Sequence, residues 1–282
     1  MNIRIIPRLD IKGPNLVKGI HFEGLRVLGK PEQFAKYYYE NFADELIFMD
    51  AVASLYGRNS LLDIISKTSK DIFIPLSVGG GIRSIDDISK ILRAGADKVV
   101  INTAAINNPE LIQKASQKFG SSTIVISIEA IKKDDGYYEA YTDYGRESTG
   151  TDAIKWALKA AELGAGELMV TSINNEGTGN GFDIELIKQI STSVKIPVIA
   201  CGGAGNLNHI LDVIVEGNAD AVSVASILHY NAIKVIDSDN NIFLIEGNIE
   251  FLMKKQPFTR VKNSSIVDLK KYLLKKGLNC RL

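Results

Sequence analysis

Eight short runs of apolar and β-branched residues recur along this chain, and each is followed by a stretch with helical periodicity. Strands that alternate with helices pair in parallel, because the helix supplies the crossover that a parallel connection needs. Eight such units predict one α/β domain, a closed (βα)8 barrel of the TIM type. The runs lie at residues 3–10, 45–50, 72–78, 98–102, 123–129, 167–172, 196–201 and 221–225.

The segments between the runs carry helix signals. Pro31 opens one segment, 31–42, at a position that suits the first turn of a helix. Ser84 is a predicted N-cap for 84–95, which ends at Gly95. A third helix is predicted to begin at Thr151 and to end at Gly164.

The two halves of the chain resemble each other. Matching residues recur in the same order at offsets of about 120 residues, which indicates two fused half-barrels rather than chance. The matching pairs are Asp10 with Glu129, Glu45-Leu46 with Glu167-Leu168, Gly80-Gly81 with Gly202-Gly203, and Ala96-Asp97 with Ala219-Asp220.

Charge and composition exclude several classes of protein. Lys+Arg and Asp+Glu both number 33 in the 282 residues, so no net charge attracts nucleic acid or an anionic membrane. No apolar run reaches the about 18 residues of a membrane span. Cys201 and Cys280 form no C-x-x-C pair, and the three histidines lack metal-ligand spacing. We therefore expect a cytoplasmic protein without a metal or other cofactor.

Ligands of such barrels bind where strands end and loops begin. Glycine at a strand end lets backbone N–H groups approach an anion. Two groups of residues at predicted strand ends therefore indicate two phosphate cradles on opposite sides of one mouth. The first cradle comprises Gly80, Gly81, Asn102 and Thr103, and the second comprises Gly202, Gly203, Ala225 and Ser226.

The motifs at these positions resemble one family, the cyclase subunit of imidazole-glycerol-phosphate synthase, an ammonia-using enzyme of histidine biosynthesis. The resemblance covers residues 3 to about 229 and returns in the last helix. A sister family, the sugar isomerase of the same pathway, shares the half-barrel repeat. It implies a ribulosyl substrate with two phosphates and adds Gly177 to the second cradle. The motifs are IIPRLDIKGPNLVKG, DELIFMD, VGGGI, GADKVVINTAA, NNEGTGNGFD and IACGGAGN.

The resemblance also implies a catalytic pair, Asp10 and Glu129. Two opposed carboxyls suit a cyclisation that needs proton transfer on both sides of the substrate. At the second position the family has aspartate, and the extra methylene of Glu129 moves the carboxyl by roughly a bond length. Arg8 lies on the same face of the strand as Asp10, where the family carries a small uncharged residue. Its guanidinium would hold Asp10 ionised; alternatively it pairs with Glu129 or a substrate anion, or only stabilises the barrel.

Charged residues begin four predicted strands at the opposite end: Arg4, Glu45, Lys98 and Glu167. Such charges can be a plug that only stabilises the barrel. The resemblance implies instead a salt-bridged gate for ammonia that faces a glutaminase subunit, in a heterodimer, with Asp97 in the interface.

Residues from about 231 to 265 form an insertion between the last strand and the last helix, where the family runs on almost directly. It leaves a strand at the end of the barrel where ligands bind. Three roles are therefore open: a lid over the site, an ordered surface segment, or a surface for assembly with another chain. Two hypotheses about the function remain open because of Glu129, Arg8 and this insertion. The first is the cyclase reaction on a bis-phosphorylated ribulosyl aminoimidazole carboxamide. The second is a related ammonia conduit and glutaminase activator for amidination of a nucleotide-linked surface sugar.

Overall fold

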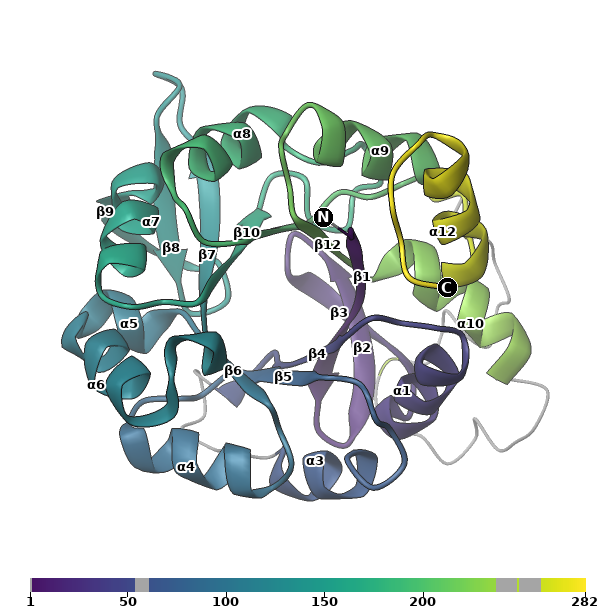
Figure 1. Ribbon diagram of the computed structural model, residues 1–282, viewed down its shortest axis with the longest axis horizontal. Helices are drawn as coiled ribbons and strands as arrows, with labels where there is room; N and C mark the ends of the chain where they lie inside the picture. The colour runs from purple at the N-terminus through teal and green to yellow at the C-terminus, as the bar shows by residue number, and fades with distance from the viewer. Residues whose placement is uncertain (1, 54–60, 237–247, 249–259) are drawn as a thin grey trace.

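The strands of this protein close into a ring. The computed structural model describes residues 2–53, 61–236, 248 and 260–282. Parallel pairing runs from β1 through β4, β5, β6, β7, β10, β11 and β12 and returns to β1. Figure 1 looks along this ring and shows the helices outside it. The predicted (βα)8 barrel is confirmed.

All eight barrel strands match predicted runs. They are β1 (Arg4–Lys12), β4 (Leu46–Asp50), β5 (Leu76–Gly79), β6 (Lys98–Ile101), β7 (Ile124–Lys132), β10 (Glu167–Ser172), β11 (Val198–Cys201) and β12 (Ala221–Val224). β5 and β11 begin later than predicted, directly after Pro75 and Pro197. Proline has no N–H to give to a ladder, so pairing starts beyond it.

The helices cover the outside of the barrel. They are α1 (Pro31–Glu40), α3 (Leu62–Thr68), α4 (Ile85–Arg93), α5 (Thr103–Asn107), α6 (Glu110–Phe119), α7 (Ala153–Glu162), α8 (Ile184–Ser193), α9 (Leu207–Val215), α10 (Ser226–Ile236) and α12 (Ile266–Lys275), with a short 3-10 helix at Ser121–Thr123. The Ser84 cap of α4 is confirmed, since its side chain accepts from the Asp87 N–H. The predicted start at Thr151 was wrong: Asp152 caps α7, because Thr151 is still part of a strand.

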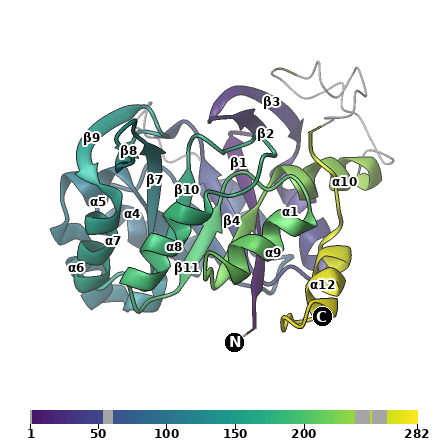
Figure 2. The ribbon, with the colours of Figure 1, turned by 90° about the horizontal axis from the view of Figure 1, so that it is seen from above.

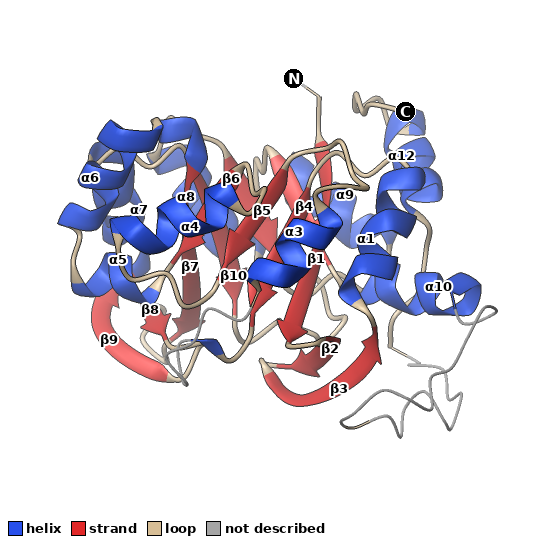
Figure 3. Ribbon diagram, turned by 90° about the horizontal axis from the view of Figure 1, so that it is seen from below, coloured by secondary structure: helices blue, strands red, loops and turns tan. Residues whose placement is uncertain are grey.

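Two antiparallel hairpins, which the sequence analysis missed, stand on the carboxyl end of the barrel (Figures 2 and 3). β2 (Asn15–Ile20) and β3 (Glu23–Gly29) extend β1, whereas β8 (Tyr138–Thr142) and β9 (Glu147–Asp152) extend β7. Each hairpin follows the first strand of one predicted half, so the repeat extends to these additions.

Side chains of the barrel strands pack in two separate layers. Outward-facing residues such as Ile126, Val170 and Val222 join the large core between strands and helices. Their inward-facing neighbours form a smaller apolar cluster inside the ring. Its members are Ile6, Ile47, Met49, Val100, Val125, Met169, Ile199, Cys201 and Ala221.

The first residues of the insertion predicted for about 231 to 265 are helical. Residues 231–236 complete α10, because the helix that starts at Ser226 continues to Ile236. Residues 237–247 and 249–259, on which the predicted lid mainly falls, lie outside the described residues. Asn248 accepts a backbone hydrogen bond of 2.9 Å from Val27 of β3. This contact attaches one point of the insertion to the first hairpin.

Candidate active site

Asp10 and Glu129 lie inside the barrel near its carboxyl end. Their exposed fractions are only 1% and 2%. Both were predicted at strand ends, yet β1 continues to Lys12 and β7 to Lys132. The strands are longer because the hairpins pair with them: Asp10 lies opposite Val17 of β2, and Glu129 lies opposite Tyr141 of β8. The two carboxyls thus sit on equivalent strands of the two halves.

Arg8 binds Asp10 directly. Its Nε donates to Asp10 Oδ1 at 2.8 Å, and both side chains are buried. The Nη1 group donates to Cys201 Sγ at 3.4 Å, and the guanidinium carbon lies 5.3 Å from the centre of the Phe22 ring. The prediction that Arg8 shares a face with Asp10 is confirmed, and its ion-pair partner is Asp10 rather than Glu129. The ion pair with Arg8 suits Asp10 to the role of a proton acceptor.

Glu129 has a different environment. Burial raises its pKa from 4.5 to about 7, although the charge of Arg8 and hydrogen bonds from Gly145 and Asn102 oppose this rise. Its Oε2 atom has no hydrogen-bond partner among the described residues. A carboxyl with this pKa is partly protonated at neutral pH and can donate a proton. The two carboxyls are therefore suited to opposite roles.

The first cradle borders an open cavity of about 320 Å³. Gly80 and Gly81 have φ values of 97° and 71°, and a Cβ on Gly80 would lie 2.5 Å from the Asp50 carbonyl oxygen. Both features require glycine here. Asn102 and Thr103 line the same cavity, which also reaches Glu129. All four predicted residues of this cradle therefore come together.

The second hairpin supports the first cradle. The Asn102 amide donates to the Tyr141 carbonyl oxygen at 3.0 Å, and the Thr103 hydroxyl accepts from the Asp143 N–H at 3.1 Å. Tyr144, in the same turn, is buried and lines the cavity beside Glu129. No run of apolar residues marks a strand in this part of the sequence, so this support was not predicted.

The second cradle is nearly filled. Its five predicted residues, Gly177, Gly202, Gly203, Ala225 and Ser226, do line one pocket, but the cavity measures only about 20 Å³. Arg8, Lys18 and Glu176 occupy the remaining wall. Lys18 of β2 and Glu176, both buried, form an ion pair, and this pairing lowers the pKa of Glu176 although burial alone would raise it. The two halves of the mouth are therefore unequal in size.

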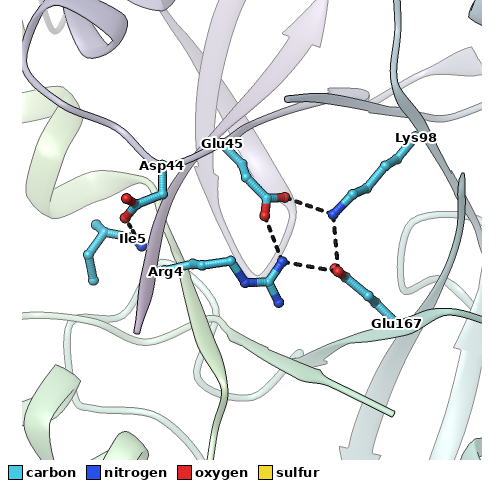
Figure 4. A network of polar contacts seen from close by, with 6 residues as sticks. All are labelled: Arg4, Ile5, Asp44, Glu45, Lys98 and Glu167. Carbon is cyan, nitrogen blue, oxygen red and sulfur yellow. Dashed lines mark hydrogen bonds and ion pairs between the residues drawn. The ribbon is translucent and has the colours of Figure 1, made fainter. Parts of the chain in front are cut away.

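A charged ring closes the opposite end of the barrel (Figure 4). Arg4 Nη1 binds Glu45 at 2.6 Å and Glu167 at 3.0 Å. Lys98 Nζ binds the same two carboxylates at 3.1 Å and 3.0 Å. Two cations and two carboxylates from four strands thus alternate around the barrel axis. Asp97 is exposed beside the ring, and its carboxylate accepts from the Leu76 N–H at 2.8 Å.

Comparison with known proteins agrees with this geometry. A family model described as "Histidine biosynthesis protein" matches residues 4–234. Three similar proteins are each named "Imidazole glycerol phosphate synthase subunit HisF". The protein from Legionella pneumophila is 58% identical over 73% of this chain and 97% of its own length. Those from Methanocaldococcus jannaschii and Alkaliphilus metalliredigens are 50% and 46% identical, over 80% and 82% of this chain and 90% and 92% of their own lengths.

The chain belongs to the HisF family. Two residues of this HisF-family barrel were quoted within motifs but not assigned a role: Lys18 in NLVKG and Glu176 in NNEGTG. The signal in the sequence for Lys18 was a charged residue within a segment that is otherwise uncharged, NLVKGI. The pairing of Lys18 with Glu176 could not be seen, because the two residues are 158 positions apart in the sequence.

Two other polar residues of the HisF-family chain, His229 and Cys201, are buried within the fold. His229 is fully buried beside Tyr38, whose hydroxyl lies 2.6 Å from His229 Nδ1. Burial lowers the pKa of His229 to about 3, so it is neutral at pH 7. Cys201 is a buried thiol whose pKa is raised by burial. Within the described ranges, no cluster of three metal-ligating side chains occurs, and no helix is long and apolar enough to cross a membrane.

Proposed function

We propose that this HisF-family chain is the cyclase-type subunit of an imidazole glycerol phosphate synthase. In this reaction ammonia cleaves a bis-phosphorylated ribulosyl aminoimidazole carboxamide, and the fragment that keeps the ribulosyl carbons closes into an imidazole ring. The observation that carries the proposal is the pair of buried carboxyls, Asp10 and Glu129, in unlike environments at one mouth.

Each carboxyl has a role that follows from its surroundings. Asp10, ion-paired with Arg8, accepts a proton from the nitrogen that attacks during cleavage and ring closure. Glu129, with a pKa of about 7, donates a proton to the oxygen or nitrogen that leaves. A pair of this kind can assist both bond cleavage and ring closure without a metal ion.

The first cradle holds one phosphate of the substrate. Its cavity of about 320 Å³ connects Gly80 and Gly81 with Glu129, which brings the ribulosyl chain to the carboxyls. The second cradle, at about 20 Å³, must widen to take the other phosphate. We propose that the phosphate displaces the Glu176 carboxylate from Lys18, because both anions can form an ion pair with the Lys18 side chain.

Ammonia enters at the other end in this proposal. A glutaminase subunit docks on the face around Asp97 to form a heterodimer, and its ammonia passes the ring of Arg4, Glu45, Lys98 and Glu167. The ring blocks this end unless an ion pair opens, which couples passage to the partner. Two unpaired cysteines support a cytoplasmic complex.

The test is steady-state turnover of the bis-phosphorylated substrate, with either ammonium salt or the glutaminase complex as nitrogen source. Asp10→Asn should lower kcat by about 100-fold to 10,000-fold with both sources. Glu110→Gln, which changes only an exposed helix pair, should leave kcat unchanged. Absence of turnover by the wild-type protein, where a reference HisF works, would refute the proposal.

The second candidate function has a specific observation in its favour. Arg8 and the Lys18–Glu176 pair nearly close the second cradle, which disfavours a ligand with a phosphate at each end. We therefore retain a barrel that activates glutaminase and passes ammonia to another protein, which amidinates a nucleotide-linked sugar. Glutaminase activation by a chain that does not turn over the cyclase substrate would favour this candidate.

A further inference from the structure

A layer of unsatisfied polar atoms lies inside the barrel. Four inward-facing side chains carry buried atoms without a hydrogen-bond partner among the described residues. They are Arg8 Nη2, Ser127 Oγ, Glu129 Oε2 and Ser223 Oγ, and the Thr171 Oγ1 atom is likewise buried beside the thiol of Cys201. Folded proteins rarely leave buried polar atoms without a protein or water partner. Several in one place indicate a small hydrogen-bonding molecule between them.

Strand register makes most of these groups neighbours on adjacent strands. Glu129 of β7 lies opposite Thr171 of β10, Thr171 lies opposite Cys201 of β11, and Cys201 lies opposite Ser223 of β12. Because side chains alternate along a strand, all four face the barrel interior. Arg8 Nη1 donates to Cys201 Sγ at 3.4 Å, so the guanidinium lies beside these residues. Together with Arg8, the four residues form a polar arc on the inner wall of the barrel.

The arc lies between two different environments. Toward the charged ring, the next inward residues of β10, β11 and β12 are apolar, namely Met169, Ile199 and Ala221, whereas that of β7 is Ser127. In the other direction lies the catalytic pair, Asp10 and Glu129. A small molecule that travels inside the barrel from the ring meets the apolar layer first and the polar arc last.

We propose that Arg8, Thr171 and Ser223 form a binding site for one ammonia molecule directly beneath the catalytic carboxyls. The proposal rests on the proposed function, in which ammonia passes along the barrel. Ammonia has one lone pair and three N–H groups, which match a guanidinium donor and hydroxyl acceptors. Thr171 and Ser223 are positioning residues here, because they hold the nucleophile rather than exchange protons with it.

The hydrogen-bonding groups of Arg8 determine which form of the molecule binds. An ammonium ion has no lone pair to accept a hydrogen bond from Nη2, and the charge of the guanidinium is already paired with Asp10. Neutral ammonia can accept this hydrogen bond and is also the nucleophilic form. Water offers the same hydrogen-bonding groups, so it is the competing occupant.

A binding experiment on the full chain tests the site without requiring turnover. Near pH 9.5 much of the added ammonium is neutral ammonia. Replacing sodium chloride by ammonium chloride at equal ionic strength should then raise the wild-type melting temperature by about 2 °C. The shift should vanish at pH 7 and in the double variant Thr171→Val, Ser223→Ala. A shift that is absent in the wild type, or that persists in the double variant, would overturn the proposal and indicate a water site.

A second experiment measures product formed per glutamine hydrolysed in the complex with glutaminase. The double variant should lower this ratio at least threefold and raise the KM for ammonia, with little change in the KM for the phosphorylated substrate. Thr68→Val is the matched control, because its hydroxyl is also buried without a partner but lies on α3, outside the barrel interior. An unchanged ratio in a folded double variant would contradict the proposal. If the wild type binds ammonia but forms no product, the proposed function fails while the site stands.

Discussion

Arg8→Met tests the ion pair at the centre of the active site. Methionine keeps an apolar stem of similar length but removes the guanidinium. Asp10, which is 1% exposed, would then lose its 2.8 Å partner and remain as a buried charge. Removal of one partner from such a pair lowers the free energy of unfolding by about 3–5 kcal/mol. We expect a loss in this range.

A double-mutant cycle isolates the pair itself. Adding Asp10→Asn to Arg8→Met removes the unpaired charge, so the double variant should recover most of the lost stability. The coupling energy should reach at least about 2 kcal/mol. The measurement is reversible urea unfolding, followed by circular dichroism at pH 7.5. Arg93→Met, at an exposed helix position, is the matched control and should change stability by less than about 0.5 kcal/mol. The reasoning is refuted if Arg8→Met costs less than about 1 kcal/mol, or if the double variant is as unstable as Arg8→Met.

Three further predictions concern other parts of the barrel. Because the Glu129 carboxyl loses its proton as the pH rises through about 7, kcat should decline above that pH, and Glu129→Gln should abolish this decline along with most activity; a pH-independent wild-type rate would contradict the assignment. Lys98→Met leaves one cation in the charged ring for two carboxylates, so the ring no longer controls the passage of ammonia. The amount of product formed per glutamine hydrolysed should then fall in the glutaminase complex, and an unchanged ratio would show that the ring does not control passage. Gly203→Ala places a Cβ 2.0 Å from the Gly181 carbonyl oxygen at a φ of +106°, so urea unfolding should show a free energy of unfolding lower by about 2 kcal/mol or more. Gly24→Ala, where the Cβ meets open space, should lower it by about 1 kcal/mol, and equal losses would refute the steric argument.

The two cradles differ in size although they occupy equivalent places in the two halves. Repeat symmetry predicts equal cradles, and the glycines of both do adopt the left-handed conformation. The difference comes from side chains that reach in from elsewhere: Arg8 from β1, Lys18 from β2, and Glu176 from the loop after β10. The size of the second cradle therefore depends on residues outside the glycine motifs.

Periodicity was enough to predict the eight barrel strands, because a buried parallel strand is a nearly continuous apolar run. It failed for the four hairpin strands. β8 and β9, for example, contain Glu139, Ser148 and Thr149, and even the buried positions of β8 include polar side chains such as Glu139. Without a run of apolar residues, these segments resemble polar loops.

The sequence by itself determined the closed barrel, its two halves, the inward positions of Arg8, Asp10 and Glu129, and the charged residues at the opposite end. The barrel, its halves, the shared face of Arg8 and Asp10 and the charged strand starts follow from alternation and spacing, which are local properties of a strand. The family resemblance identified Asp10 and Glu129 as an opposed pair. Only the tertiary structure decided that Arg8 pairs with Asp10, that Glu129 keeps an oxygen without a partner, and that Lys18 meets Glu176 inside the second cradle. Partners and burial depend on which distant strands become neighbours when the barrel closes, and burial sets the pKa of Glu129.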